Sequence, residues 1–202
     1  TTAVNLALAL SSKGNKVGLL DGDIYGPNQL QMLGLNAQPP ESKDGKHFMP
    51  LTAHGIKVIS MACFIKDDQP AIWRGPMASK AVQQLFYDTQ WGELDYLIID
   101  LPPGTGDVVL TLAQKFPVDG ALVVTTPQDV ALADVRRALM MFRKVNVPLL
   151  GVVENMSYYH CPNCTHDSYP FGQQGGKRLA DEYDISLLAQ MPLDAAICRY
   201  AD

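Results

Sequence analysis

The sequence has few cysteines, few charged residues and no long apolar run. Four cysteines among 202 residues are too few for a disulfide scaffold, which favours a reducing compartment and makes the cytoplasm the expected location. No apolar run reaches the roughly 18 residues that a membrane span requires, and we find no signal-peptide pattern. The net charge of −5 argues against a basic nucleic-acid surface. We therefore expect neither a membrane nor nucleic acid as a partner.

Short apolar runs alternate with helical patterns along the chain. The expected strands lie at 16–21, 55–61, 96–100, 121–125, 149–153 and 187–191, and the expected helices at 1–10, 79–89, 108–115, 131–145 and 176–183. This order predicts βαβ units, that is, an α/β fold whose mostly parallel sheet has helices on both faces. We expect residues 1–202 to form one domain.

Polar residues follow several of the predicted strands. They lie at 21–28, 100–107, 126–128 and 154–157. Ligands of such sheets bind beyond the carboxyl ends of the strands, so these segments are candidates for one site. Each acid taken singly can equally be a helix cap or a turn residue.

The segment from Asp100 to Asp107 is the most specific of these. Four apolar residues followed by Asp100 fit a Walker-B strand, whose acid holds Mg²⁺, usually through water. Two prolines and two glycines follow, and they predict a loop that can present an amide to a γ-phosphate and move when the phosphate leaves. Asp21 and Asp23 could order a water and a metal nearby. The alternative for residues 100–107 is a tight turn in which Asp107 caps the next helix.

Cys161 and Cys164 have the spacing of metal ligands. Two cysteines three positions apart can direct both sulfur atoms at one point, so one chain offers half of a four-thiolate site and two chains offer a whole one. A zinc site completed by His160 and His166, a redox dithiol and two buried thiols remain alternatives. We expect Cys63 and Cys198 to pack as small apolar residues.

The motifs together resemble those of a known family. The chain is similar to the Mrp/ApbC iron–sulfur cluster carrier proteins, which are P-loop ATPases of the MinD/ParA superfamily, and the resemblance covers nearly its whole length. The matching segments are Thr1–Ala7, Asp21–Pro27, Trp73–Met77, Asp100–Asp107 and Glu154–Ser157, followed by the Cys161/Cys164 pair.

The resemblance implies a nucleotide site. Asp23 would lie near the attacking water, and Asp100 would be the Walker-B acid. The remaining residues implied to bind the nucleotide are Thr1 and Thr2 after the phosphate loop, Gly104, Thr105 and Gly106 in the mobile loop, Asn155 at the adenine edge, and Pro192 and Asp194 near the base. ATP and Mg²⁺ are the implied cofactors of the full-length protein.

The resemblance also implies a cargo. Cys161 and Cys164, in a loop at about 157–175, would hold a bridging [4Fe–4S] cluster together with the same pair from a second subunit. The implied partners are a second copy of the chain, forming a homodimer, and the apoproteins that receive the cluster. Nucleotide binding or hydrolysis would modulate the transfer.

Two features depart from the family pattern. The family's phosphate-binding loop, Gly-Lys-Gly-Gly-Val-Gly-Lys-Ser, would stand just before Thr1 and is absent, so we expect a fragment that binds ATP poorly or not at all. Position 174, where we expect a glycine, is Gln174.

Two other classes of function compete with a cluster carrier. A MinD/ParA-like positioning ATPase would act through a membrane or DNA, but the chain has neither a basic stripe nor a C-terminal amphipathic helix, and such a protein needs no cysteine pair. A zinc-binding regulatory or interaction module without ATPase activity is the second alternative. The segment Trp73–Pro76 could be a docking surface or an anchored loop, and Met140 and Met141 are expected in the core.

Overall fold

The computed structural model describes residues 1–42, 44–64 and 75–201. By its internal contacts the chain divides into two units, Thr1–Val109 and Leu110–Tyr200, which are described separately. The expectation of one domain stays a prediction. Trp73 and Arg74 lie outside the described residues, so the alternatives for that segment also stay open.

The first unit contains a four-stranded sheet in the order β2-β3-β1-β4. Its central strand β1, Val17–Asp21, is buried along its whole length and pairs in parallel with β3, Ile56–Ser60, and β4, Tyr96–Asp100. The short β2, Leu51–Ala53, pairs antiparallel with β3. Burial on both faces explains why β1 reads as a continuous apolar run.

Helix α1, Thr2–Ser12, packs on this sheet. Its buried Val4 and Ala7 belong to a core cluster with Leu19, Val58 and Cys63, which confirms that Cys63 packs as a small apolar residue. The other helices that begin in this unit are α2 (Gln29–Met32), the 3₁₀ helix η1 (Met61–Phe64), α3 (Gly75–Tyr87) and α4 (Asp107–Lys115). The helix α3 begins four residues before the predicted Ser79, because proline is well tolerated in a first helical turn and Pro76 does not block it.

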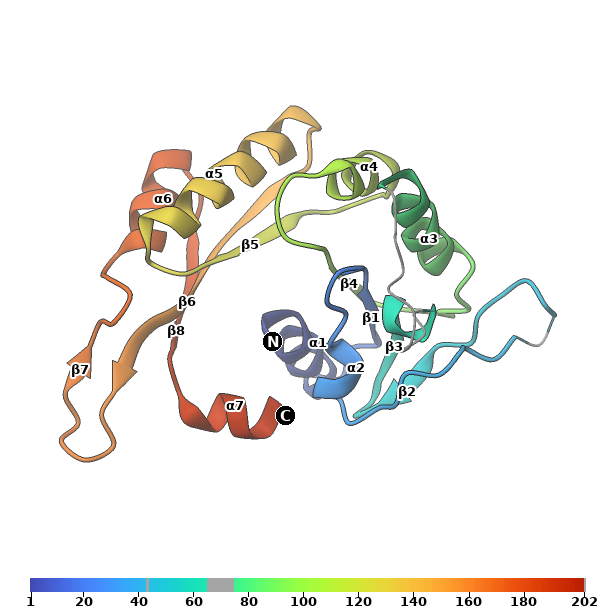
Figure 1. Cartoon of the computed structure of the whole chain (residues 1–202), viewed down its shortest axis with the longest axis horizontal. Coiled ribbons are helices and arrows are strands. Elements are labelled where there is room, and N and C mark those ends of the chain that lie inside the picture. The colour runs from blue at the N-terminus through green and yellow to red at the C-terminus, as the bar shows by residue number, and fades with distance from the viewer. Residues whose placement is uncertain (43, 65–74, 202) are drawn as a thin grey trace. The chain divides into compact units, whose positions relative to one another are not determined.

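The second unit is built on three parallel strands with β6 in the middle. β6, Leu149–His160, pairs with β5, Ala121–Thr125, and with β8, Leu187–Pro192. The helices α5, Asp129–Lys144, and α6, Gly175–Tyr183, lie on the same side of these strands (Figure 1). Buried Leu132, Leu139, Val152 and Leu179 form the core between helices and strands. Helix α7, Ala195–Ala201, follows β8.

Strand β6 is longer than predicted. The sequence places its end at residue 153, but the strand continues through Glu154–Ser157 to His160 and pairs antiparallel with the short β7, Asp167–Ser168. The prediction was wrong because the polar residues 154–157 fall at a register shift between β6 and β8, not at the end of the strand. The resulting β6–β7 hairpin carries the cysteine pair and extends from the strands of the second unit (Figure 1).

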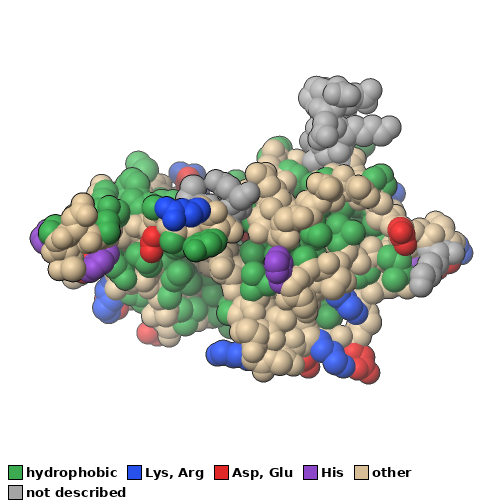
Figure 2. Space-filling view, turned by 90° about the horizontal axis from the view of Figure 1, so that it is seen from below, with side chains coloured by type: hydrophobic (Ala, Val, Ile, Leu, Met, Phe, Trp, Pro, Cys, Tyr) green, Lys and Arg blue, Asp and Glu red, His purple; other side chains and the backbone are tan. Residues whose placement is uncertain are grey.

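The predicted α/β class is confirmed, with mixed but mostly parallel strands in the two sheets. The placement of Met140 in the core was wrong, because its side chain is 55% exposed. None of the helices in the described part of the chain is long and apolar enough to cross a membrane. On the face shown in Figure 2, the described Lys and Arg side chains form separate groups instead of a continuous stripe.

Neighbouring residues on α5 offer a test of this packing. Leu139 is fully buried, whereas Met140 is 55% exposed. Leu139→Ala should lower the free energy of unfolding by about 2–5 kcal/mol, because it leaves a cavity in the core. Met140→Ala, the matched control, should change it by less than about 0.5 kcal/mol. Urea denaturation of both variants measures the difference, and equal losses would contradict the assigned faces of α5.

Candidate functional site

Two acids face each other at the carboxyl edge of the first sheet. Asp21 ends β1 and Asp100 ends β4, and the parallel register places them directly opposite each other. Ser60 ends β3 on the other side of Asp21. The parallel strands therefore bring together Asp21 and Asp100, which the sequence placed after two separate strands, and add Ser60, which was not among the predicted site residues.

Asp21 is a fully buried carboxylate. It accepts hydrogen bonds from Ser60 Oγ at 2.8 Å and from the backbone N–H groups of Gln29 and Asp23, both at 3.3 Å. Burial raises the pKa of Asp21 to about 6, since the loss of solvation outweighs these hydrogen bonds, and the nearby Asp100 carboxylate acts in the same direction. The group is therefore poised to gain a proton or a cation.

Gln29 links the two acids and was missed by the sequence analysis. Its backbone bonds Asp21, and its side-chain Nε2 donates to Asp100 Oδ2 at 2.6 Å. Gln29 is only 2% exposed, and its Oε1 has no hydrogen-bond partner among the described residues. No local motif marks a glutamine for this position, because the contact to Asp100 spans 71 residues.

Asp100 lies close to Thr1 as well as to Asp23. Burial raises the pKa of Asp100 most, and the Asp23 carboxylate acts in the same direction. Asp23 itself is half-buried, and its Oδ1 accepts from the backbone N–H groups of Tyr25 at 2.9 Å and Gly26 at 3.3 Å. The structure thus brings Thr1, Asp23 and Asp100 to one edge, with Asp23 also stabilising its own turn. Thr2 begins α1 beside Thr1.

The loop after β4 is open. Gly104 has a φ of +92° and no atom near the position of a side chain, and Gly104, Thr105 and Gly106 are exposed. A pocket of about 220 Å³ lies between this loop, the Tyr25 turn and the starts of α3 and α4. The side chain of Asp107, which begins α4, lies outside the described part. Its predicted capping role stays a prediction. The pocket is lined by Tyr25, Gly75, Pro102, Pro103, Gly106, Val108 and Val109.

The cysteine pair lies at the end of the β6–β7 hairpin. Cys161 is half-buried, Cys164 is exposed, and both are free thiols. A tight turn forms because Cys161 N–H donates to His166 O at 3.0 Å and Thr165 N–H donates to Cys161 O at 2.9 Å. The backbone N–H groups of Cys164 and Asn163, together with the Cys164 thiol, lower the pKa of Cys161. The turn therefore favours the thiolate, which is the form that binds metal.

Neither nearby histidine completes a metal site within the chain. His160 Nδ1 pairs with Asp167 Oδ1 at 2.7 Å across the hairpin. Among residues 1–42, 44–64 and 75–201, we find no group of three or more His, Cys, Asp or Glu side chains that could hold a metal ion. The described residues therefore give no support to the zinc site predicted from His160 and His166.

The residues predicted to surround the base lie together in the second unit. Asn155 is in β6, and Pro192 ends β8 opposite Tyr158 of β6. The Asn155 Oδ1 accepts from Met156 N–H at 3.0 Å, and Asp194 Oδ1 accepts from Ala196 N–H at 2.7 Å in the first turn of α7. Their contacts to a nucleotide stay predictions. The side chain of Cys198 is not described.

Position 174 shows why a glycine is expected there. Gln174 precedes α6 with φ 58° and ψ 22°, a left-handed conformation that favours glycine. The glutamine nevertheless adopts this conformation, and α6 begins at Gly175, one residue before the predicted Gly176.

The raised pKa of Asp21 predicts a pH dependence. Its carboxyl binds a proton more tightly when folded, with a pKa of about 6 against 3.8, so its contribution to stability is present at low pH and is lost as the pH rises through about 6. Between about pH 4.5 and 7.5, the wild type should lose about 2 kcal/mol more unfolding free energy than Asp21→Asn. Urea denaturation across this range measures the loss.

The exposed Asp134 on α5 supplies the control for this experiment. Asp134→Asn removes one carboxylate without touching the buried cluster, so its pH dependence should follow that of the wild type. If Asp21→Asn followed the wild type as well, the buried carboxyl would not be the source of the dependence.

Comparison with known proteins places the chain in a family. All of its residues, 1–202, match the ParA family, described as NUBPL iron-transfer P-loop NTPase. It is 54% identical to an iron–sulfur cluster carrier protein of Pseudomonas fragi over 100% of this chain and 71% of that protein. It is also 54% identical to one of Escherichia coli over 98% of this chain and 53% of that protein. The chain thus spans about half to about seven tenths of these relatives.

Solved structures agree with this placement. A nucleotide-binding protein from Archaeoglobus fulgidus, in complex with ADP and with cobalt, matches with a TM-score of 0.86 and 34% identity, over 100% of this chain and 79% of that one. The septum site-determining protein MinD of Pyrococcus horikoshii shares the fold, with a TM-score of 0.63 and 21% identity over 98% of this chain and 77% of that one. The chain belongs to the ParA family of NUBPL-type iron-transfer P-loop NTPases.

Proposed function

We propose that this chain is the main part of an iron–sulfur cluster carrier. Two copies would hold one [4Fe–4S] cluster through Cys161 and Cys164 of each and deliver it to recipient apoproteins. The observation that carries this proposal is the hairpin turn, which presents two free thiols without further ligands from the described residues of the same chain. The names of the relatives, carrier and transfer proteins, support it.

The state of the thiols suits a cargo that must be taken up and released. The backbone N–H groups that lower the pKa of Cys161 favour its thiolate before a cluster arrives. Cys164 is exposed, so a recipient's own thiolates can reach the cluster and replace the carrier's ligands one by one. A site closed by four ligands from one chain would resist that exchange.

The acidic cluster of the first unit would serve the nucleotide. In a protein that includes the phosphate-binding loop, Asp100 would hold Mg²⁺ through water, and Asp23 would orient the attacking water. Gly104, Thr105 and Gly106 would reach the γ-phosphate from an exposed loop. Thr1 and Thr2 would lie beside the phosphates, and Asn155, Pro192 and Asp194 beside the base. Magnesium supplies charge stabilisation there, and the closeness of Thr1, Asp23 and Asp100 supports the assignment.

Nucleotide state would act on the carrier through the loop after β4. This loop and the turn that contains Asp23 border the same pocket of about 220 Å³, so a change in phosphate contacts can alter both. We propose that ATP binding and hydrolysis modulate cluster transfer in this way. The cysteine usage supports a cytoplasmic location.

Removing either thiol tests the carrier function. Cys161→Ala and Cys164→Ala should abolish cluster uptake after anaerobic incubation with iron and sulfide, because each leaves an incomplete ligand set. The wild type should gain a broad visible absorbance and about four irons per two chains. Cys63→Ala, the matched control in the core of the first unit, should retain both signals.

Two results would contradict the carrier proposal. One is a full cluster in either hairpin variant. The other is a colourless wild type that binds one zinc ion per chain, which would favour the zinc-binding regulatory module.

A substitution of Asp100 tests the nucleotide site. In a protein that includes the phosphate-binding loop, Asp100→Asn should lower magnesium-dependent ATP hydrolysis roughly 100-fold, because the metal loses a negative partner. Cluster uptake without nucleotide should be unchanged. Asp95→Asn is the control, because Asp95 is an exposed acid just before β4 whose carboxylate accepts from the Lys16 backbone N–H at 2.7 Å. Unchanged hydrolysis in Asp100→Asn would remove Asp100 from this role.

A further inference from the structure

The two stems of the cysteine loop converge on one buried side chain. Strand β6 runs from the sheet to His160, and the chain returns through β7 to the start of α6 at Gly175. Glu154 lies in the outgoing stem, where it is the last β6 residue paired with β5, opposite Thr125. It is fully buried.

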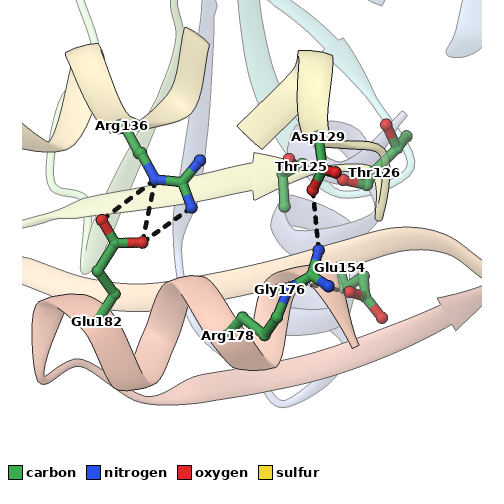
Figure 3. A network of polar contacts seen from close by, with 8 residues as sticks. All are labelled: Thr125, Thr126, Asp129, Arg136, Glu154, Gly176, Arg178 and Glu182. Atoms are coloured by element: carbon green, nitrogen blue, oxygen red, sulfur yellow. Dashed lines mark hydrogen bonds and ion pairs between the residues drawn. The ribbon is translucent and has the colours of Figure 1, made fainter. Parts of the chain in front are cut away.

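The Glu154 carboxylate bonds β6, α6 and a neighbouring strand. Its Oε2 accepts from the backbone N–H of Gly176 in the first turn of α6, where the chain returns from the hairpin. Its Oε1 accepts from Ser157 Oγ at 2.5 Å in the outgoing stem and from Gln190 Nε2 at 2.8 Å in β8. Figure 3 shows Glu154 beside Gly176, with Arg178 directed to Asp129. Glu154 and Gly176 are 22 positions apart in the sequence, so one carboxylate closes the base of the loop between them.

The same contacts hold an irregular part of β6. Between Glu154 and Tyr158 the register with β8 shifts, and Met156 has a φ of 52°. Gln190 Nε2 also donates to Ser157 Oγ at 3.1 Å, so Glu154, Ser157 and Gln190 bond one another across the irregularity. Such irregularities redirect a strand and the side chains that follow it. Here the side chains that follow include the cysteine pair.

The glycines at the start of α6 permit the contact. A Cβ on Gly176 would lie 2.9 Å from Glu154 Cβ, and a Cβ on Gly175 would lie 2.3 Å from Pro127 O. No larger residue allows the helix to approach this closely. The N-terminal end of α6 also favours a negative charge, and the hydrogen bonds from Ser157, Gln190 and Gly176 outweigh burial to lower the pKa of Glu154.

We propose that Glu154 is a positioning residue for the cluster site: by tying β6 to the first turn of α6, the two elements between which the cysteine loop lies, it fixes the direction in which Cys161 and Cys164 are presented. It acts through the backbone and touches no cargo. The inference rests on the proposed carrier function for its purpose, but the positioning role itself can be tested without a cluster.

The test is Glu154→Gln, with Glu182→Gln as the matched control. A glutamine offers one acceptor oxygen, so it cannot satisfy Gly176 on one side and Ser157 with Gln190 on the other. Glu182 is an exposed acid on α6 of the same unit and pairs with Arg136 (Figure 3). Glu182→Gln therefore makes the same chemical change and leaves the contacts of Glu154 intact.

Hydrogen exchange of the cluster-free protein measures how firmly the contacts of Glu154 hold the hairpin turn in place. In Glu154→Gln, the amides of Cys161 and Thr165 in the hairpin turn should exchange roughly 10- to 100-fold faster. The amide of Val152, which bonds Ser186 O in the sheet, should change much less. After anaerobic loading with iron and sulfide, a chelator should remove the cluster from this variant severalfold faster than from Glu182→Gln. The loss of visible absorbance measures the rate.

The exchange rates of these three amides decide whether Glu154 positions the hairpin. Equal acceleration at Val152 and in the hairpin would show a general loss of stability and overturn the positioning role, as would unchanged exchange at Cys161 and Thr165. If Glu154→Gln does not fold, Ser157→Ala, which keeps the Gly176 contact, must show a smaller but still local acceleration. A wild type that takes up no cluster would refute the carrier function, while the exchange data would still decide the positioning role.

Discussion

Both units depend on a carboxylate that is buried on a central parallel strand, opposite the last residue of a neighbouring strand. In a parallel sheet the central strand is covered on both sides, so an acid that follows its apolar residues loses its water and must find donors in the protein. Asp21 holds this position on β1 and Glu154 holds it on β6, opposite the last residue of β5. The pKa of Asp21 is raised, whereas the pKa of Glu154 is lowered.

Hydrogen-bond donors and neighbouring charges both contribute to the difference, since Asp100 raises the pKa of Asp21 and Arg178 lowers that of Glu154. Asp21 has one good donor, Ser60, and two long contacts of 3.3 Å, and its pKa rises to about 6. Glu154 has three close donors, and its pKa falls. A carboxylate left short of donors can take a cation as its missing partner, whereas a saturated one has little left to offer a ligand. The first arrangement therefore suits binding, and the second suits the support of a loop.

The sequence predicts those parts of the molecule that local patterns determine. The apolar runs locate the buried strands, and the spacing of Cys161 and Cys164 marks a candidate pair of metal ligands. The contacts of Gln29 with Asp100 and of Gln190 with Glu154 span 71 and 36 residues, and no local pattern encodes them. The length of β6 was mispredicted for the same reason: polar residues normally mark a strand end, but here Glu154 and Ser157 are buried because distant donors satisfy them.

A carrier must satisfy two opposed requirements, and the hairpin separates them along its length. The thiols must be accessible if the cargo is to leave, which places them in an exposed turn with few side chains to hold them. Their direction must nevertheless be defined if two chains are to meet on one cluster, and a two-stranded hairpin alone is only marginally stable. Stiffness therefore has to come from the base, where side chains can be buried, and not from the tip. A buried carboxylate that ties β6 to the first turn of α6 supplies it without covering the sulfur atoms.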